Sequence, residues 1–138
     1  MRGVGFLGAI LIGAAAGCGG GSGGAGGLVS CTISESIGGD AGVSLKICEE
    51  VTGSPQGAQE LRQTCTASGA GTLADAGFQV GADFENGPCS HVDALGGCQV
   101  TQGGITETGW YYDDGTGLQT SADIRTLCAT AGATYIAP

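Results

Sequence analysis

The chain has 138 residues, 13 acidic and 4 basic, and its formal net charge is −9. This length allows one domain, and so acidic a chain repels nucleic acid and anionic lipid head groups, which excludes nucleic acid as an expected partner. From residue 28 onward, Leu, Ile, Val and Phe make up only about a fifth of the residues, close to the level of a disordered chain. An interaction other than apolar burial must therefore stabilise the fold.

The N-terminal stretch has the features of an export signal. Arg2 is followed by an apolar run, residues 4–16, which is shorter than the ~20 residues that a membrane-spanning helix needs. A basic start, a short apolar core and small residues before a cut site predict a secretory signal peptide over residues 1–17. An ordinary signal peptide, cut after the A-x-A-like residues 14–16, is one reading of this segment.

The residues Ala15-Ala16-Gly17-Cys18 support a second reading. They resemble the lipobox of bacterial lipoproteins, in which a signal peptidase cuts before a cysteine that carries a diacylglycerol. The resemblance implies lipidation of Cys18. Residues 18–27 would then be a lipidated cysteine and a glycine-rich tether with a span of roughly 15–18 Å, ahead of a domain at residues 28–138.

The first half of the domain, about residues 28–75, predicts two strands and a helix. Residues 29–37 and 43–51 are rich in β-branched residues, alternate in polarity and flank a glycine-rich turn. Residues 54–69 begin with Ser-Pro, carry apolar residues at helical spacing and end on glycine. Residues 78–84 predict a short additional strand between the halves.

The second half, about residues 89–138, repeats this order. Strands are expected at residues 98–102 and 105–113, and a helix at residues 120–132 with Ser121 as its N-cap. The two helices share the pattern acid, apolar, Arg, two residues, Cys, in ELRQTC and DIRTLC. We therefore expect an α+β domain of duplicated strand-strand-helix units, with one antiparallel sheet and both helices on one face.

Six cysteines lie in the domain, and an even number in a small exported domain indicates a disulfide framework. They are Cys31, Cys48, Cys65, Cys89, Cys98 and Cys128. Zinc is the alternative, but no C-x-x-C spacing is present and His91 is the only histidine. We expect no metal and no cofactor.

The phase of the predicted elements indicates how the first half is bridged. Cys31 shares a strand face with Ile33, and Cys65 follows Leu61 by four residues on the helix. Side chains alternate across a strand and recur about every four residues on a helix, so both cysteines point into the space between sheet and helix. This predicts a Cys31–Cys65 disulfide.

By the same reasoning, the second half predicts a Cys98–Cys128 disulfide. Cys48 is one residue out of phase with Ile47 and therefore points to the other face of the sheet. Cys48 and Cys89 are left to tie the two halves together. In the chain-entropy model each bridge is worth roughly 3–4 kcal/mol.

Catalytic chemistry has few candidates. His91 lies near Asp93 and several serines, but a hydrolase triad also needs a nucleophile within reach of the base. The adjacent Asp113 and Asp114 could contribute to a calcium site but lack the alternating oxygen ligands of a calcium loop. We expect no enzyme activity. The alternative is a minor envelope enzyme or metal-binding protein in which His91, Asp93 and the acidic turn converge on a cleft.

The aromatic run GWYYDD contains Trp110, Tyr111 and Tyr112, a candidate binding surface for a protein or a glycan. Trp110 and Tyr112 share one strand face and Tyr111 takes the other. The simpler alternative is that Trp110 and Tyr112 fill a core that is poor in large residues.

The combined pattern is similar to small cysteine-rich lipoproteins of delta-proteobacteria such as myxobacteria. The shared features are the lipobox, the glycine-rich tether, GPC…LGGC, the WYY strand and a helix ending C…AG. The resemblance implies an exported protein held in the cell envelope by its lipid, a structural or binding module for which no activity is implied. Gly19 stands where an aspartate would signal inner-membrane retention, so the outer membrane is the expected location.

Overall fold

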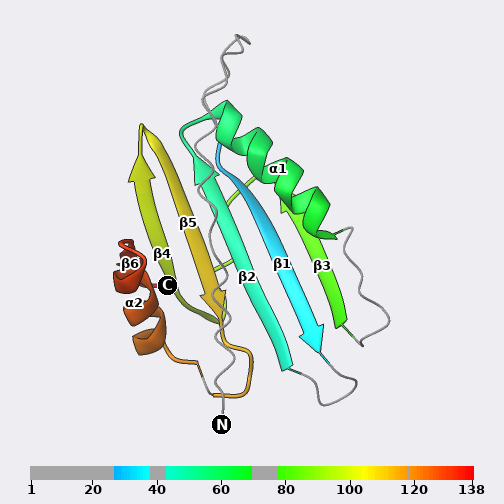
Figure 1. Ribbon diagram of the computed structural model, residues 1–138, viewed down its shortest axis with the longest axis vertical. Helices are drawn as coiled ribbons and strands as arrows, with labels where there is room; N and C mark the ends of the chain where they lie inside the picture. The colour runs from blue at the N-terminus through cyan, green and yellow to red at the C-terminus, as the bar shows by residue number, and fades with distance from the viewer. Residues whose placement is uncertain (1–26, 38–42, 70–77, 118) are drawn as a thin grey trace.

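The computed structural model describes residues 27–37, 43–69, 78–117 and 119–138, which form six strands and two helices (Figure 1). The strands are β1 (Val29–Ile37), β2 (Val43–Thr52), β3 (Phe78–Glu85), β4 (Ala94–Gln102), β5 (Ile105–Tyr112) and β6 (Thr134–Ile136). The helices are α1 (Pro55–Gly69) and α2 (Ser121–Thr130). The α+β class and the antiparallel sheet are as predicted.

The sheet consists of two halves with the same topology. Its strand order is β3-β1-β2-β5-β4-β6, and every neighbouring pair is antiparallel. Each half therefore has the order strand, strand, helix, strand, and its first strand lies between the other two. The strand predicted at residues 78–84, between the halves, forms β3 and completes the first half, whereas the third strand of the second half, β6, was not predicted. The halves meet where β2 pairs with β5.

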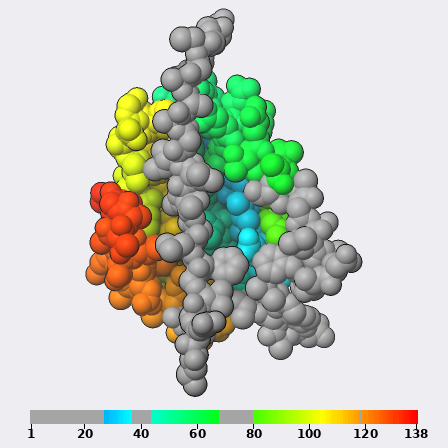
Figure 2. Space-filling model, in the orientation of Figure 1, coloured from blue at the N-terminus to red at the C-terminus, as the bar shows by residue number. Residues whose placement is uncertain are grey.

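Both helices lie on the same face of the sheet, toward its two sides (Figures 1 and 2). Helix α1 packs mainly on β1 and β3, and α2 on β4 and β6. Under α1, Cys31, Val51, Leu61 and Cys65 form a buried cluster. Under α2, an equivalent cluster contains Cys98, Ile124 and Cys128, with Tyr111 packed against it.

Each half also places a helix arginine on an aromatic ring of its third strand. The guanidinium carbon of Arg62 lies 4.7 Å from the centre of the Phe84 ring, and that of Arg125 lies 4.7 Å from the centre of the Tyr135 ring. The arginine that recurs in ELRQTC and DIRTLC therefore has the same contact in both halves. Such a contact is worth about 0.5–1 kcal/mol at an exposed site.

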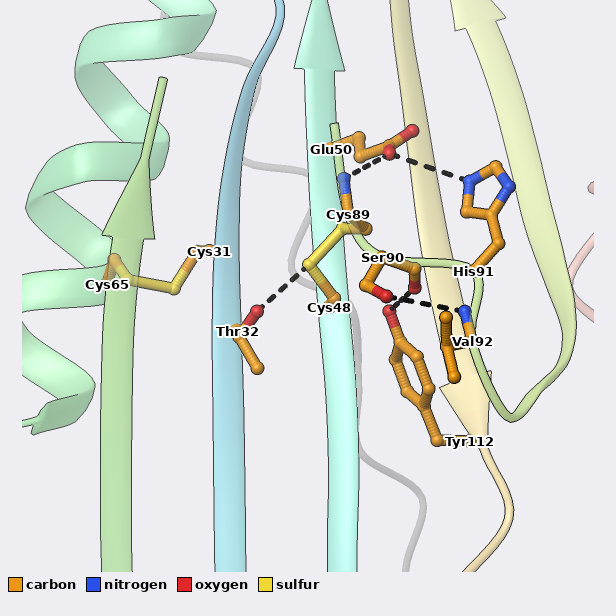
Figure 3. The surroundings of a disulfide bond; sticks show 10 residues. All are labelled: Cys31, Thr32, Cys48, Glu50, Cys65, Cys89, Ser90, His91, Val92 and Tyr112. Atoms are coloured by element: carbon orange, nitrogen blue, oxygen red, sulfur yellow. Dashed lines mark hydrogen bonds and ion pairs between the residues drawn. A yellow bond between two sulfur atoms is a disulfide. The ribbon is translucent and has the colours of Figure 1, made fainter. Parts of the chain in front are cut away.

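Three disulfides join the expected pairs, two of which followed from the phase of the elements and the third of which joins the two remaining cysteines. Cys31–Cys65 and Cys98–Cys128 each link the first strand of a half to its helix. Cys48–Cys89 lies on the opposite face of the sheet and links β2 to residues 86–93, which connect the two halves (Figure 3). We call residues 86–93 the crossing loop.

Some expected boundaries were wrong. The N-cap of α2 is Thr120, not Ser121, because the Thr120 hydroxyl accepts a hydrogen bond from the Asp123 amide while the Asp123 carboxylate accepts one from the Thr120 amide. This reciprocal capping box requires the spacing of Thr120 and Asp123. Strand β4 begins at Ala94, four residues before the expected start, and β6 was not predicted.

The turn between β2 and α1 depends on Gly53. Its φ is +95°, a conformation that side chains rarely adopt, and a Cβ at this position would collide with the carbonyl oxygen of Gly104. The close approach brings the start of α1 against the β4–β5 hairpin. Pro55 then occupies the first position of the helix, where its missing amide hydrogen is not needed.

Candidate functional site

Three of the sequence-based predictions concern residues outside the described part of the chain. These are the signal peptide at residues 1–17, the lipidation of Cys18 and most of the tether at residues 18–27, since description begins at residue 27. Neither of the helices that the structure describes has the length and apolar character needed to cross a membrane.

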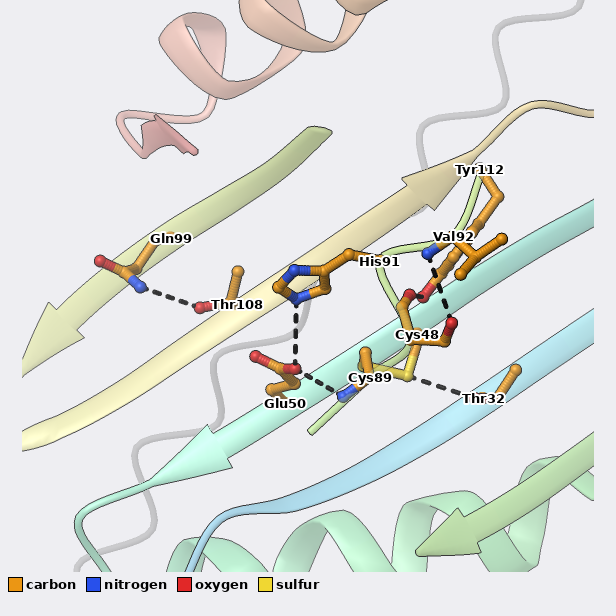
Figure 4. Close-up of polar contacts among 10 residues, drawn as sticks. Thr32, Cys48, Glu50, Cys89, His91, Val92, Gln99, Thr108 and Tyr112 are labelled. Atoms are coloured by element: carbon orange, nitrogen blue, oxygen red, sulfur yellow. Dashed lines mark hydrogen bonds and ion pairs between the residues drawn. A yellow bond between two sulfur atoms is a disulfide. The ribbon is translucent and has the colours of Figure 1, made fainter. Parts of the chain in front are cut away.

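His91 lies on the crossing loop and contacts the sheet instead of a catalytic group. Its ring stacks on Trp110 with the ring centres 3.9 Å apart and the planes tilted by 33°. Its Nε2 is 4.0 Å from Oε1 of Glu50, which also accepts a hydrogen bond from the Cys89 amide (Figure 4). The imidazole is half-exposed, and Glu50 is largely buried.

Among the described residues, no nucleophilic side chain interacts with the imidazole of His91. Among the described residues, only Glu50 and Trp110 interact with the His91 side chain, so no hydroxyl or thiol is placed to be activated by it. A general base must reach its proton within about 3 Å or through one water. The Ser90 hydroxyl instead accepts a hydrogen bond from the Val92 amide. The contacts of His91 with Trp110 and of Glu50 with the Cys89 amide hold the crossing loop against the sheet.

Two of the three predicted acidic partners of His91 accept hydrogen bonds from their own turn. The carboxylate of Asp113 accepts a hydrogen bond from the Gly115 amide, and that of Asp114 accepts two from the amide and hydroxyl of Thr116. The bonds from Thr116 lower the pKa of Asp114. Asp93 contributes its backbone carbonyl to the Asp113 amide. Within the described residues no three metal-binding side chains come together.

The aromatic run does not form one exposed surface. Trp110 and Tyr112 are 4% and 3% exposed and pack with the Cys48–Cys89 disulfide under the crossing loop, so they belong to the core. The Tyr112 hydroxyl donates to the carbonyl of Ser90 at 2.6 Å (Figure 3). Burial, and next the charge of Glu50, raise the pKa of this phenol. Only Tyr111 faces the helix side.

The helix-bearing face carries a group that sequence reasoning missed. Between the two helices, β2 and β5 present alternate residues on this face, with Glu49 directly opposite Gly109 and Val51 opposite Glu107. We call this the central strip, made of Ile47, Glu49, Val51, Glu107, Gly109 and Tyr111. Two carboxylates therefore occupy diagonal positions on a partly apolar floor.

The electrostatics of the central strip are unfavourable. Burial raises the pKa of the Glu49 carboxyl above its ordinary value of 4.5, and the charge of Glu107 raises it further. Burial, and next the charge of Glu49, raise the pKa of Tyr111. Anionic oxygens are thus gathered on a surface that water solvates incompletely.

Sequence analysis did not identify Glu50 or the acids of the central strip, but only Glu50 could have been found from a sequence signal. Glu50 lies two residues after Cys48 and so on the same strand face, and the predicted Cys48–Cys89 disulfide brings it near His91. Glu49 and Glu107 gave no such signal, because they meet only through the pairing of β2 with β5.

The chain was also compared with known proteins. No protein-family model matches it, and neither the curated proteins nor the solved structures yield a significant match.

Proposed function

We propose that this chain is an exported lipoprotein, anchored to the cell envelope through Cys18, whose domain serves as a structural or binding module and not as an enzyme. Its partner would be an envelope protein or a glycan. The resemblance of the sequence to small cysteine-rich bacterial lipoproteins supports this role.

One observation carries the proposal: three disulfides tie both helices and the crossing loop to a single sheet. Disulfides of this kind persist in oxidising compartments such as the bacterial periplasm and the cell surface. The sequence before Cys18 supplies the export and lipidation signals that such a location requires. A stable scaffold on a glycine-rich tether suits a module that is held close to a membrane.

The test is mass spectrometry of the mature protein from a Gram-negative host, combined with separation of its two membranes. We expect a mature chain that begins at Cys18, carries the mass of a diacylglycerol with or without an amide-linked acyl chain, and lies in the outer membrane. Two or three acyl chains anchor a protein durably, whereas one binds only marginally.

The matched variants are Cys18→Ser and Ser22→Ala. Cys18→Ser should remain an uncleaved precursor or be released without lipid, and Ser22→Ala should be lipidated as the parent is. A mature chain that begins at Gly19 or later, or an unmodified Cys18 within a disulfide, would refute the anchor.

A further inference from the structure

The central strip lacks a counter-ion within the described part of the chain. The protein has only four basic side chains, one of which is Arg2. The other three, Lys46, Arg62 and Arg125, each lie over an aromatic ring, at 4.6–4.7 Å from its centre. No described cation forms an ion pair with Glu49 or Glu107.

The surroundings of the two carboxylates are apolar and only partly covered. Ile47 and Tyr111 flank them on the strip, and both side chains are half-buried, as are Glu49 and Glu107. Helix α1 covers Val51 at one end of the strip, but both helices pack mainly on strands other than β2 and β5 and so border the rest of it. The result is a sheet face on which apolar side chains surround two acids that form no ion pair with any described residue.

Gly109 leaves room at the centre of the strip. A Cβ built at this position would meet only Cε2 of Tyr111, at 4.0 Å, among the described atoms. The residue directly across from it is Glu49. A side chain from another molecule can therefore approach the Glu49 carboxylate over the glycine.

We propose that the central strip is a docking surface for a segment of another envelope protein that presents a lysine or arginine beside apolar side chains. The cation pairs with Glu49 and Glu107, and the apolar groups cover Ile47 and Tyr111. Charge complementarity identifies the partner class, because among the described residues Lys46, Arg62 and Arg125 lie over aromatic rings and none of them pairs with the two acids. This inference rests on the proposed role as a binding module and names its surface.

Binding should also relieve a cost that the free protein carries. A like charge and poor solvation disfavour the ionised form of Glu49, whereas a cation within about 4–6 Å favours it. A partly desolvated pair of this kind contributes both affinity and specificity. An acidic segment would meet repulsion at the same place.

The experiment titrates two capped ten-residue peptides, one alternating lysine with leucine and one alternating glutamate with leucine, into the oxidised, isotope-labelled Cys18→Ser chain. Because this variant carries no lipid, the result does not depend on whether the anchor exists. We expect the lysine peptide to shift the amide resonances of β2 and β5 around Glu49 and Gly109. The glutamate peptide should leave them unchanged.

Two double variants and two glycine variants then distinguish binding at the strip from attraction by net charge. Glu49→Gln with Glu107→Gln removes both carboxylates and should raise Kd for the lysine peptide about tenfold. Asp83→Asn with Glu85→Gln removes the same charge from exposed positions on the opposite face of β3 and should change Kd less than about twofold. Gly109→Val keeps every charge but fills the strip and should weaken binding, whereas Gly81→Val, in open space on β3, should not.

Several results would overturn the proposal. Equal losses in the two double variants would show attraction by net charge alone. If the lysine peptide does not bind at millimolar concentration, the central strip is not a docking surface. The same holds if the shifts are confined to the face of the sheet that carries no helix. If the resonances of the strip move with protein concentration, the strip binds a second copy of the chain. If they move on deletion of residues 19–26, it binds the chain's own N-terminal segment.

Discussion

Glu49 is the residue at which stability and binding are expected to conflict. Its raised pKa means that the folded state holds the proton more tightly than the unfolded chain does. The stabilising contribution of the protonated form is therefore complete below the ordinary pKa of 4.5 and is lost as pH rises through the raised value.

Glu49→Gln should consequently raise the thermal midpoint of unfolding at pH 7, and the gain should shrink as pH falls toward 4. Asp83→Asn, at an exposed position on the other face, should show no such trend. The measurement is the midpoint of each variant across this pH range, by circular dichroism. A gain for Glu49→Gln that is equal at pH 4 and pH 7 would contradict the burial argument.

Residue-level patterns predicted the disulfides but not the acids of the central strip. Two cysteine pairs followed from alternation within single elements, as for Cys31 beside Ile33 and Cys65 four residues after Leu61, and the third pair followed by elimination. Glu49 and Glu107 are 58 positions apart in the sequence, and they meet only because β2 pairs with β5. The sequence around either glutamate contains no sign of that pairing.

At the scale of the elements, α2 shows how closely its start is specified. Thr120 and Asp123 exchange hydrogen bonds, whereas Ser121 is only the first helical residue. Substituting a threonine N-cap by alanine typically costs about 1 kcal/mol, and a surface change away from a cap stays within about 0.5 kcal/mol.

Thr120→Ala should therefore destabilise the domain by about 1 kcal/mol, and Ser121→Ala by much less. Chemical denaturation of both variants, with disulfides intact, checks the difference. If both variants lose the same free energy of unfolding, Thr120 is not the residue that caps the helix. The bonds from Thr120 to Asp123 also lower the pKa of that carboxyl, so Thr120→Ala should raise it.

Elements with strong local signals were predictable, and short ones were not. Strands β1 and β2 have alternating β-branched residues on both sides of a glycine-rich turn, and α1 has a proline at its first position. Strand β6 has only three residues, Thr134–Ile136, too few for alternation to be recognised. It forms because β4 offers it an edge, which is a property of the sheet and not of the segment.

For the molecule as a whole, the disulfides carry a large share of the stability. The bonded cysteines are 30, 34 and 41 residues apart, and loops of this length correspond to about 4 kcal/mol each in the chain-entropy model. The total stability of a domain is typically 5–15 kcal/mol. Of the twelve apolar residues that are buried in the described part of the chain, six are these cysteines.

Reduction and alkylation of all six domain cysteines should therefore unfold the chain. The measurement is the far-ultraviolet spectrum, with the same alkylating agent applied to the unreduced protein as control. An unchanged spectrum after complete reduction would show that apolar packing suffices.

The crossing loop makes the consequence of proteolysis depend on which side of Cys89 is cut. A cut within residues 86–88 leaves the C-terminal fragment bonded to Cys48. A cut within residues 90–93 leaves each fragment with its own helix-to-strand disulfide but no covalent bond to the other. Only non-covalent contacts, among them the β2–β5 pairing and the packing around Trp110, would then hold the C-terminal fragment in place. The position of a single cut therefore decides whether the two halves stay covalently joined.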